Sequence, residues 1–195
     1  MINASTGGAI IGDVPPPVNE EMTPKPSSPY GASKLFAEGY CSAYAQSYGF
    51  NTVSLRFSNI YGPYSKNKGS VVAAFLKDIA SSRKVTVYGD GSQTRDYLYV
   101  EDLASGIVAA IDQQVSGVFQ LGSGVGTTIN KLISILKEVV DINFDVNYEK
   151  FRQGEILHTY CNISKAKNAF GFDPSIELQT GIEKTYRWFK EQKLL

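Results

Sequence analysis

Strand-like and helix-like segments alternate along most of this chain. Short runs rich in β-branched and aromatic residues are typical of buried strands, and they occur at 51–57, 85–88, 97–100, 118–121 and 144–148. Amphipathic patterns typical of helices occur at 30–48, 70–81, 101–112, 128–140 and 178–192. Strands that alternate with helices usually pair in parallel through helical crossovers, so the pattern predicts an α/β fold.

Length and charge narrow the classes of function. The 195 residues suffice for one large domain or for one domain with an appendage. The chain has 19 basic and 19 acidic residues, and this balance argues against a protein that mainly binds nucleic acid. No apolar run approaches the ~20 residues of a membrane span, so no membrane association is expected.

The few cysteines and histidines limit metal and redox chemistry. Cys41 and Cys161 are too few for a disulfide framework or a four-cysteine zinc site, and His158 is the single histidine. The sequence therefore predicts no metal site, and a reducing, cytoplasmic location is expected.

A tyrosine and a lysine at the start of the first predicted helix are the clearest candidates for catalysis. Tyr30 and Lys34 are four residues apart, and residues at that spacing share one face of a helix. An ammonium group beside a phenol favours the phenolate, which makes the phenol a better base at neutral pH. A hydroxyl from Ser5 or Thr6, in the small-residue turn at 4–12, would complete the site by hydrogen-bonding a substrate oxygen. The same spacing is also common in pairs on the surface of a helix. The surrounding motifs therefore decide whether Tyr30 and Lys34 form a catalytic pair.

That context is a series of motifs in a fixed order. They are the hydroxyl-bearing turn at 4–12, SPYGASK at 28–34, LRFSNIYGP at 55–63, VYGDGSQTRDYLYVEDLA at 87–104, LGSG at 121–124, RQGE at 152–155 and GFDP at 171–174. The series covers nearly the whole chain and resembles the extended short-chain dehydrogenase/reductase family, specifically its NAD-dependent nucleotide-sugar epimerases and dehydratases.

The resemblance implies a fold and a division into domains. The fold would be the C-terminal part of a Rossmann-like parallel sheet plus a smaller α/β substrate-binding domain. Residues 1–66 would be the remnant of the dinucleotide-binding domain. Residues 67–195 would mainly bind the nucleotide sugar, with a segment of about 95–115 returning to the Rossmann part. The helix at 30–48 matches one that forms a dimer interface in this family, so a homodimer is expected.

The resemblance also implies a role for each matched residue. Tyr30 would exchange a proton with a sugar hydroxyl while a hydride passes to NAD, and Lys34 would favour its phenolate and bind the nicotinamide ribose. Phe57 and Ser58 would lie beside the nicotinamide. The nucleotide-sugar ligands would be Asn59 on the sugar, Arg95 and Arg152 on the diphosphate, Glu155 on the ribose, and Val87 and Tyr88 around the base.

Two departures from the family pattern affect this interpretation. The family's catalytic Ser or Thr usually occupies the position of Gly7, and here the hydroxyl is displaced to Thr6, with Ser5 behind it. The G-x-G-x-x-G turn that binds NAD in this family is absent from the sequence. The most similar glycine-rich segment, at 122–126, predicts a structural turn before a helix. The chain therefore resembles the C-terminal portion of an epimerase, and we expect this portion to be inactive alone.

The function predicted by these residues is NAD-dependent epimerisation of a nucleotide sugar, most like UDP-glucose/UDP-galactose 4-epimerisation. A dehydratase or decarboxylase is the alternative, but such enzymes usually carry an acidic residue in the turn where this chain has Gly8 and Ala9. A non-catalytic nucleotide-sugar-binding fragment is a further alternative, because the cofactor half is not found in the sequence. Thr159 aligns with a residue that limits the C2 substituent, so a small Thr there predicts that N-acetylated sugars are admitted.

Overall fold

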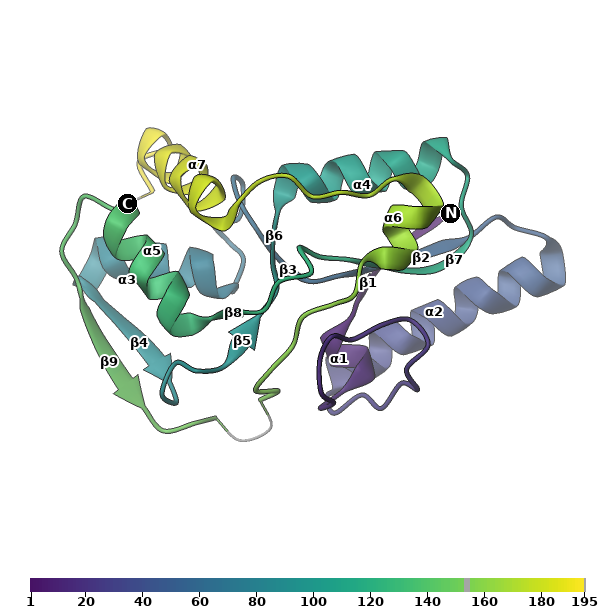
Figure 1. The fold of residues 1–195 in the computed structure, drawn as a ribbon, viewed down its shortest axis with the longest axis horizontal. Coiled ribbons are helices and arrows are strands. Elements are labelled where there is room, and N and C mark those ends of the chain that lie inside the picture. Colours follow the sequence, from purple (N-terminus) through teal and green to yellow (C-terminus); the bar gives the residue numbers. More distant parts are fainter. Residues whose placement is uncertain (153–154, 195) are drawn as a thin grey trace.

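The computed structural model describes residues 1–152 and 155–194 and has the alternating architecture that the sequence predicts (Figure 1). The strands are β1 (Ile2–Thr6), β2 (Val53–Phe57), β3 (Asn59–Tyr61), β4 (Lys84–Tyr88), β5 (Thr94–Arg95), β6 (Tyr97–Tyr99), β7 (Gly117–Leu121), β8 (Thr127–Thr128) and β9 (Asp145–Glu149). The helices are α1 (Gly8–Ile11), α2 (Pro29–Tyr48), α3 (Val71–Ser82), α4 (Val100–Asp112), α5 (Ile129–Val139), α6 (Ser164–Phe170) and α7 (Leu178–Glu191).

Three parallel strands form the sheet that supports the candidate site. β2 lies in the centre, with β1 on one side and β7 on the other, and both pairs are parallel. In Figure 1, α4 and α6 lie above these strands, and α1 and α2 lie below them. A parallel sheet with helices on both faces is Rossmann-like, and here it begins with β1 at the N-terminus. The predicted α/β class and parallel sheet are confirmed.

The central strand β2 is buried on both faces, and its alternating side chains explain why. Val53 and Leu55 belong to a hydrophobic cluster that the strand shares with β7, α4 and α6. Arg56 points to the opposite face, where its guanidinium forms a buried ion pair of 2.7 Å with Glu38 of α2. Ser5 of β1 donates a 2.6 Å hydrogen bond to the same carboxylate. The polar cluster therefore ties α2 to the two strands that it covers.

A second hydrophobic cluster is formed by α3, α5 and α7 with the parallel pair β4 and β9. The parallel pair β3 and β6 contributes to both clusters, because successive side chains of a strand point to opposite faces. Tyr97 and Tyr99 lie in the second cluster, whereas Leu98 between them lies in the first. This ribbon joins the two parts of the molecule, and the predicted domain division at residue 66 stays a prediction.

Most predicted elements agree with the structure to within about two residues. Thr128 caps α5, since its hydroxyl accepts a hydrogen bond from the Lys131 backbone nitrogen at 3.1 Å. The elements that the sequence did not predict are short, namely α1, α6, β3, β5 and β8. Such elements span too few residues for a hydrophobic period to show.

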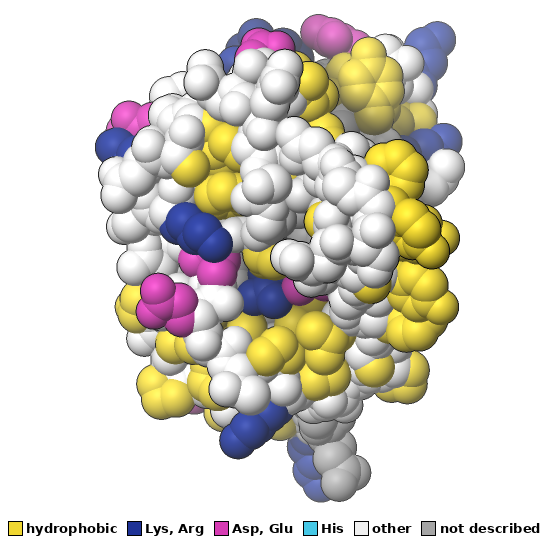
Figure 2. Space-filling model, turned by 90° about the vertical axis from the view of Figure 1, so that its right-hand side faces the viewer, with side chains coloured by type: hydrophobic (Ala, Val, Ile, Leu, Met, Phe, Trp, Pro, Cys, Tyr) yellow, Lys and Arg dark blue, Asp and Glu magenta, His cyan; other side chains and the backbone are white. Residues whose placement is uncertain are grey.

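One face of α2 carries large exposed aromatic side chains. They include Phe36, Tyr40, Tyr44 and Tyr48, and the rings of Phe36 and Tyr40 lie 4.5 Å apart. Figure 2 views the molecule from the side where α2 ends, and hydrophobic side chains gather along one margin of that face. The predicted homodimer through this helix stays a prediction. Within the described ranges, no helix has both the length and the apolar character needed to cross a membrane.

Candidate active site

Two adjoining cavities open beside the carboxyl ends of parallel strands, the first at β1 and β2 and the second at β4. The tyrosine cavity has a volume of about 570 Å³, and its lining includes Tyr30, Thr6 and Phe57. The arginine cavity has a volume of about 470 Å³, and its lining includes Arg152 and Tyr88. A neck belongs to both cavities and consists of Asn59, Gly69, Ser70 and Arg95. The carboxyl ends of parallel strands are the usual ligand-binding edge of an α/β sheet, and the predicted residues meet there.

The first turn of α2 places the candidate tyrosine at the mouth of the tyrosine cavity. Ser28 caps the helix by accepting a hydrogen bond from the Gly31 backbone nitrogen at 3.1 Å. Tyr30 lines the cavity and is 56% exposed. Lys34 holds its Nζ 5.9 Å from the centre of the Tyr30 ring and donates a hydrogen bond to the Ala4 carbonyl at 3.0 Å. The predicted tyrosine–lysine pair therefore shares one face of the helix.

The two candidate hydroxyls lie on opposite faces of β1. Ser5 is buried, and its hydroxyl donates a hydrogen bond to the carboxylate of Glu38 in α2. Of the two, Thr6 belongs to the described lining of the tyrosine cavity, and it pairs in register with Phe57 of β2. Adjacent residues of a strand point in opposite directions, so only one of the pair can face a ligand. The structure thus places Thr6 at the cavity and gives Ser5 a structural hydrogen bond instead.

The glycine turn after β1 lines the tyrosine cavity, and two side chains pack close against it. A Cβ atom at Gly7 would meet Oε1 of the buried Gln120. A Cβ atom at Gly8 would lie 2.8 Å from the Thr159 hydroxyl oxygen. A Ser or Thr at Gly7 would therefore require the end of the Gln120 side chain to move.

The arginine cavity collects the residues predicted for the nucleotide. Val87, Tyr88, Arg152 and Glu155 all line it. The Arg152 guanidinium carbon lies 3.6 Å from the centre of the Tyr88 ring, a cation–π contact that presents a flat surface. The other two residues of the RQGE motif, at 153–154, lie outside the described part of the chain.

The neck is held in place by backbone hydrogen bonds. One guanidinium nitrogen of Arg95 donates to the carbonyl oxygens of Thr94 at 2.9 Å and Leu157 at 3.1 Å. The Asn59 backbone nitrogen donates to the Asp96 carbonyl at 2.9 Å. These contacts fix Arg95 and Asn59 between the two cavities, where a linear ligand would pass from one to the other.

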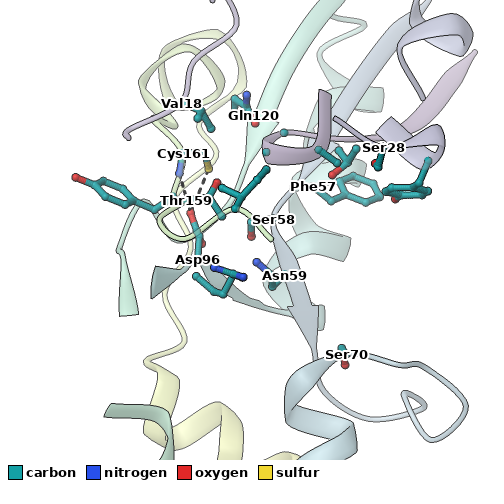
Figure 3. A pocket seen from close by; sticks show the side chains of 18 of the residues that line it. Val18, Ser28, Phe57, Ser58, Asn59, Ser70, Asp96, Gln120, Thr159 and Cys161 are labelled. Atoms are coloured by element: carbon teal, nitrogen blue, oxygen red, sulfur yellow. Dashed lines mark hydrogen bonds between the residues drawn. The ribbon is translucent and has the colours of Figure 1, made fainter. Parts of the chain in front are cut away.

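A buried carboxylate that the sequence analysis did not predict, that of Asp96, lines the tyrosine cavity. Asp96 accepts hydrogen bonds from the backbone nitrogens of Ser123, Gly124 and Cys161, at 2.7 to 3.2 Å, and from the Ser123 hydroxyl. The Cys161 thiol also donates to it at 3.2 Å, and Figure 3 shows the two residues joined beside Thr159. Burial and the neighbouring carboxylate raise the pKa of this thiol, so it stays protonated. The glycine-rich turn after β7 thus donates hydrogen bonds to a protein carboxylate.

Several buried polar atoms around the cavities lack a partner among the described residues. They are Ser58 Oγ, Ser70 Oγ and Gln120 Nε2 beside the tyrosine cavity and Gln93 Oε1 beside the arginine cavity. A buried polar atom without a hydrogen bond costs about 1–3 kcal/mol, and most such atoms in folded proteins are satisfied. The walls of the two cavities therefore contain buried polar atoms that a hydrogen-bond partner would stabilise.

A comparison with protein families gives a direct match. The model of the NAD dependent epimerase/dehydratase family matches residues 1–122, more than half of the chain. The chain belongs to this family. The match starts at the first residue and takes in β1 and the glycine turn, and it does not locate the chain within the longer family members. The predicted C-terminal position therefore stays a prediction.

Individual family members agree with this assignment. The UDP-glucose 4-epimerase of Mycolicibacterium smegmatis is 30% identical over 98% of this chain and 63% of its own length. The Thermotoga maritima UDP-glucose 4-epimerase, solved with UDP-glucose, matches with a TM-score of 0.91 and 35% identity over 98% of this chain and 63% of that one. The Bacillus cereus UDP-glucuronic acid 4-epimerase, solved with UDP-glucuronic acid and NAD, gives 0.91 and 31% over 98% and 61%. The chain thus spans 63% or less of these relatives.

Two glycines of α2 provide a matched test of how this family member positions Tyr30. A Cβ atom at Gly31 would meet the backbone carbonyl of Ala9, whereas one at Gly39 would have no heavy atom within 4 Å. Gly31→Ala should lower the free energy of unfolding in urea by about 3 kcal/mol, because α2 must move away from α1. Gly39→Ala should raise it by about 1 kcal/mol, because alanine favours the helix. Equal effects at the two positions would contradict this account of the helix contact.

Proposed function

We propose that this chain forms the nucleotide-sugar-binding and proton-transfer part of an NAD-dependent UDP-sugar 4-epimerase. One observation carries the proposal: the tyrosine cavity and the arginine cavity share a neck. A ligand with a base at one end, a diphosphate in the middle and a sugar at the other end matches this shape and its order of residues. The expected preference for UDP-glucose and UDP-galactose is part of the proposal.

The nucleotide end of the ligand would occupy the arginine cavity. Tyr88 and Val87 would contact the base, and Glu155 would accept hydrogen bonds from the ribose hydroxyls. Arg152 and Arg95 would hold the diphosphate, since a guanidinium fork matches two phosphate oxygens. The Tyr88–Arg152 contact supports this arrangement because it holds the guanidinium against the ring within the arginine cavity.

The sugar would lie in the tyrosine cavity with its C4 hydroxyl at Tyr30. Tyr30 would take the proton of that hydroxyl and return it, acting as general base and then general acid. Thr6 would hydrogen-bond the same oxygen, and Lys34 would stabilise the phenolate through its charge. NAD, when bound, supplies the acceptor that takes a hydride from C4 and returns it to the other face of the sugar.

The described residues fit one end of NAD better than the other. Beside the nicotinamide, Ser58 offers a buried hydroxyl without a partner, and the Lys34 ammonium retains N–H groups after its bond to Ala4. The G-x-G-x-x-G turn that would hold the pyrophosphate, in contrast, is not found in the sequence. We therefore propose that this chain contacts the nicotinamide riboside and that other groups hold the pyrophosphate.

The chemistry of the tyrosine cavity favours an epimerase over a dehydratase. Among its described lining residues the acidic one is Asp96, and both of its carboxylate oxygens already accept hydrogen bonds from Ser123, Gly124 and Cys161. A carboxylate with this many donors is not available for general acid or base work. Epimerisation needs a single acid/base, which Tyr30 would provide.

Calorimetric titration of this chain with UDP-glucose tests the proposal. UDP-glucose should bind, and Arg152→Met should weaken its binding about tenfold or more, because a charge-assisted hydrogen bond contributes about 1.5–3 kcal/mol. Lys150→Met, a change of a neighbouring exposed cation, is the matched control and should have little effect. NAD should bind weakly to this chain. Absence of UDP-glucose binding, or equal losses in the two variants, would reject the proposal.

Thr159 lines the tyrosine cavity, as the proposed role in sugar selection requires. A small side chain there leaves space for an N-acetyl group at C2. Thr159→Tyr should therefore weaken binding of UDP-N-acetylglucosamine at least tenfold more than binding of UDP-glucose, as measured by calorimetry. Thr159→Ser is the control and should retain both. Intact binding of the N-acetylated sugar by the tyrosine variant would refute this role.

A further inference from the structure

The tyrosine cavity contains a buried amide for which the proposed mechanism has no use. Gln120 lies on β7, is 1% exposed and belongs to the described lining of this cavity, where Figure 3 labels it. Its neighbours Phe119 and Leu121 point into the hydrophobic cluster that β7 shares with α4 and α6. Because successive side chains of a strand point to opposite faces, Gln120 points to the other face of the sheet, where α1 and α2 lie.

The side-chain amide of Gln120 is held against the glycine turn without a full set of hydrogen bonds. Its Oε1 occupies the space that a Cβ atom at Gly7 would take, and its Nε2 has no partner among the described residues. The backbone nitrogen of Gln120 is satisfied, since it donates to the Glu20 carboxylate at 2.7 Å. A buried amide lacking a partner is costly. A sugar hydroxyl both donates and accepts, so it would complement either atom of the amide.

Three consecutive residues of the turn indicate which hydroxyl this is. Thr6 lines the cavity, the Gln120 amide packs against Gly7, and the Thr159 hydroxyl lies 2.8 Å from the Cβ position of Gly8. The proposed function assigns Thr6 to the oxygen at C4 and Thr159 to the substituent at C2. The amide lies between these two groups along the turn, as C3 lies between C4 and C2 in the sugar ring.

We propose that Gln120 binds the C3 hydroxyl of the sugar through its side-chain amide. This inference rests on the proposed function, because it takes the tyrosine cavity as the sugar site. Gln120 is then a specificity-determining residue: it selects sugars with a free C3 hydroxyl, holds the ring in one orientation and takes no part in proton transfer at C4.

The test is calorimetric titration with UDP-glucose, its 3-deoxy and 2-deoxy analogues, and UDP. The wild-type chain should bind the 3-deoxy analogue about tenfold more weakly than UDP-glucose, because the analogue leaves the buried amide unpaired. Gln120→Met should weaken binding of UDP-glucose and of the 2-deoxy analogue about tenfold, and it should leave binding of the 3-deoxy analogue and of UDP unchanged. Gln179→Met is the matched control, because Gln179 is an exposed amide outside the described linings of both cavities, and it should change none of the affinities.

Each other outcome overturns a specific statement. Equal losses for UDP and UDP-glucose in Gln120→Met would mean that Gln120 acts through the fold, and the inference would fail. Equal losses for UDP-glucose and its 3-deoxy analogue would place the amide at another group of the ligand and would also overturn it. A wild-type chain that binds the 3-deoxy analogue as tightly as UDP-glucose would overturn it without recourse to a variant, while leaving the proposed function intact. A wild-type chain that binds none of the four ligands would reject the proposed function itself.

Discussion

The arrangement of the site depends on a single buried carboxylate. Asp96 accepts hydrogen bonds from the turn after β7 and from the strand-like segment at Cys161, and its own carbonyl accepts from Asn59. These contacts join three segments that are far apart in the chain. Arg95 precedes Asp96, and Thr159 lies two residues before Cys161, so the same contacts position the neck and the inner wall of the tyrosine cavity. A carboxylate buried in this way is tolerated because its oxygen atoms accept hydrogen bonds.

The fold could be predicted from the sequence to a large extent, because long amphipathic helices and buried strands leave clear periods. α2, α5 and β2 were all located to within about two residues. The short elements α1, β3 and β5 carry no such signal, and they are the ones that shape the cavities. Their existence follows from tertiary contacts, such as the parallel pairing of β3 with β6, which a local pattern does not contain.

The residues of the candidate site were predicted from motifs. The structure adds which of them share a cavity and which way their strands face. Residues predicted for the base and diphosphate, such as Tyr88 and Arg152, do line one cavity. The choice between Ser5 and Thr6 needed the orientation of β1, since a one-residue shift exchanges the two faces of a strand. Asp96 follows Arg95 in the motif at 87–104. The motif alone did not show that this carboxylate is buried and accepts hydrogen bonds from the turn after β7.

The central claim is that one ligand spans both cavities, and a crystal structure of this chain with UDP-glucose tests it most directly. The account predicts continuous density from the Tyr88–Arg152 contact, past Arg95 in the neck, to a sugar whose C4 hydroxyl lies within hydrogen-bonding distance of Tyr30. A base bound in the arginine cavity with the sugar directed into solvent, or a nucleotide bound in the tyrosine cavity, would contradict it.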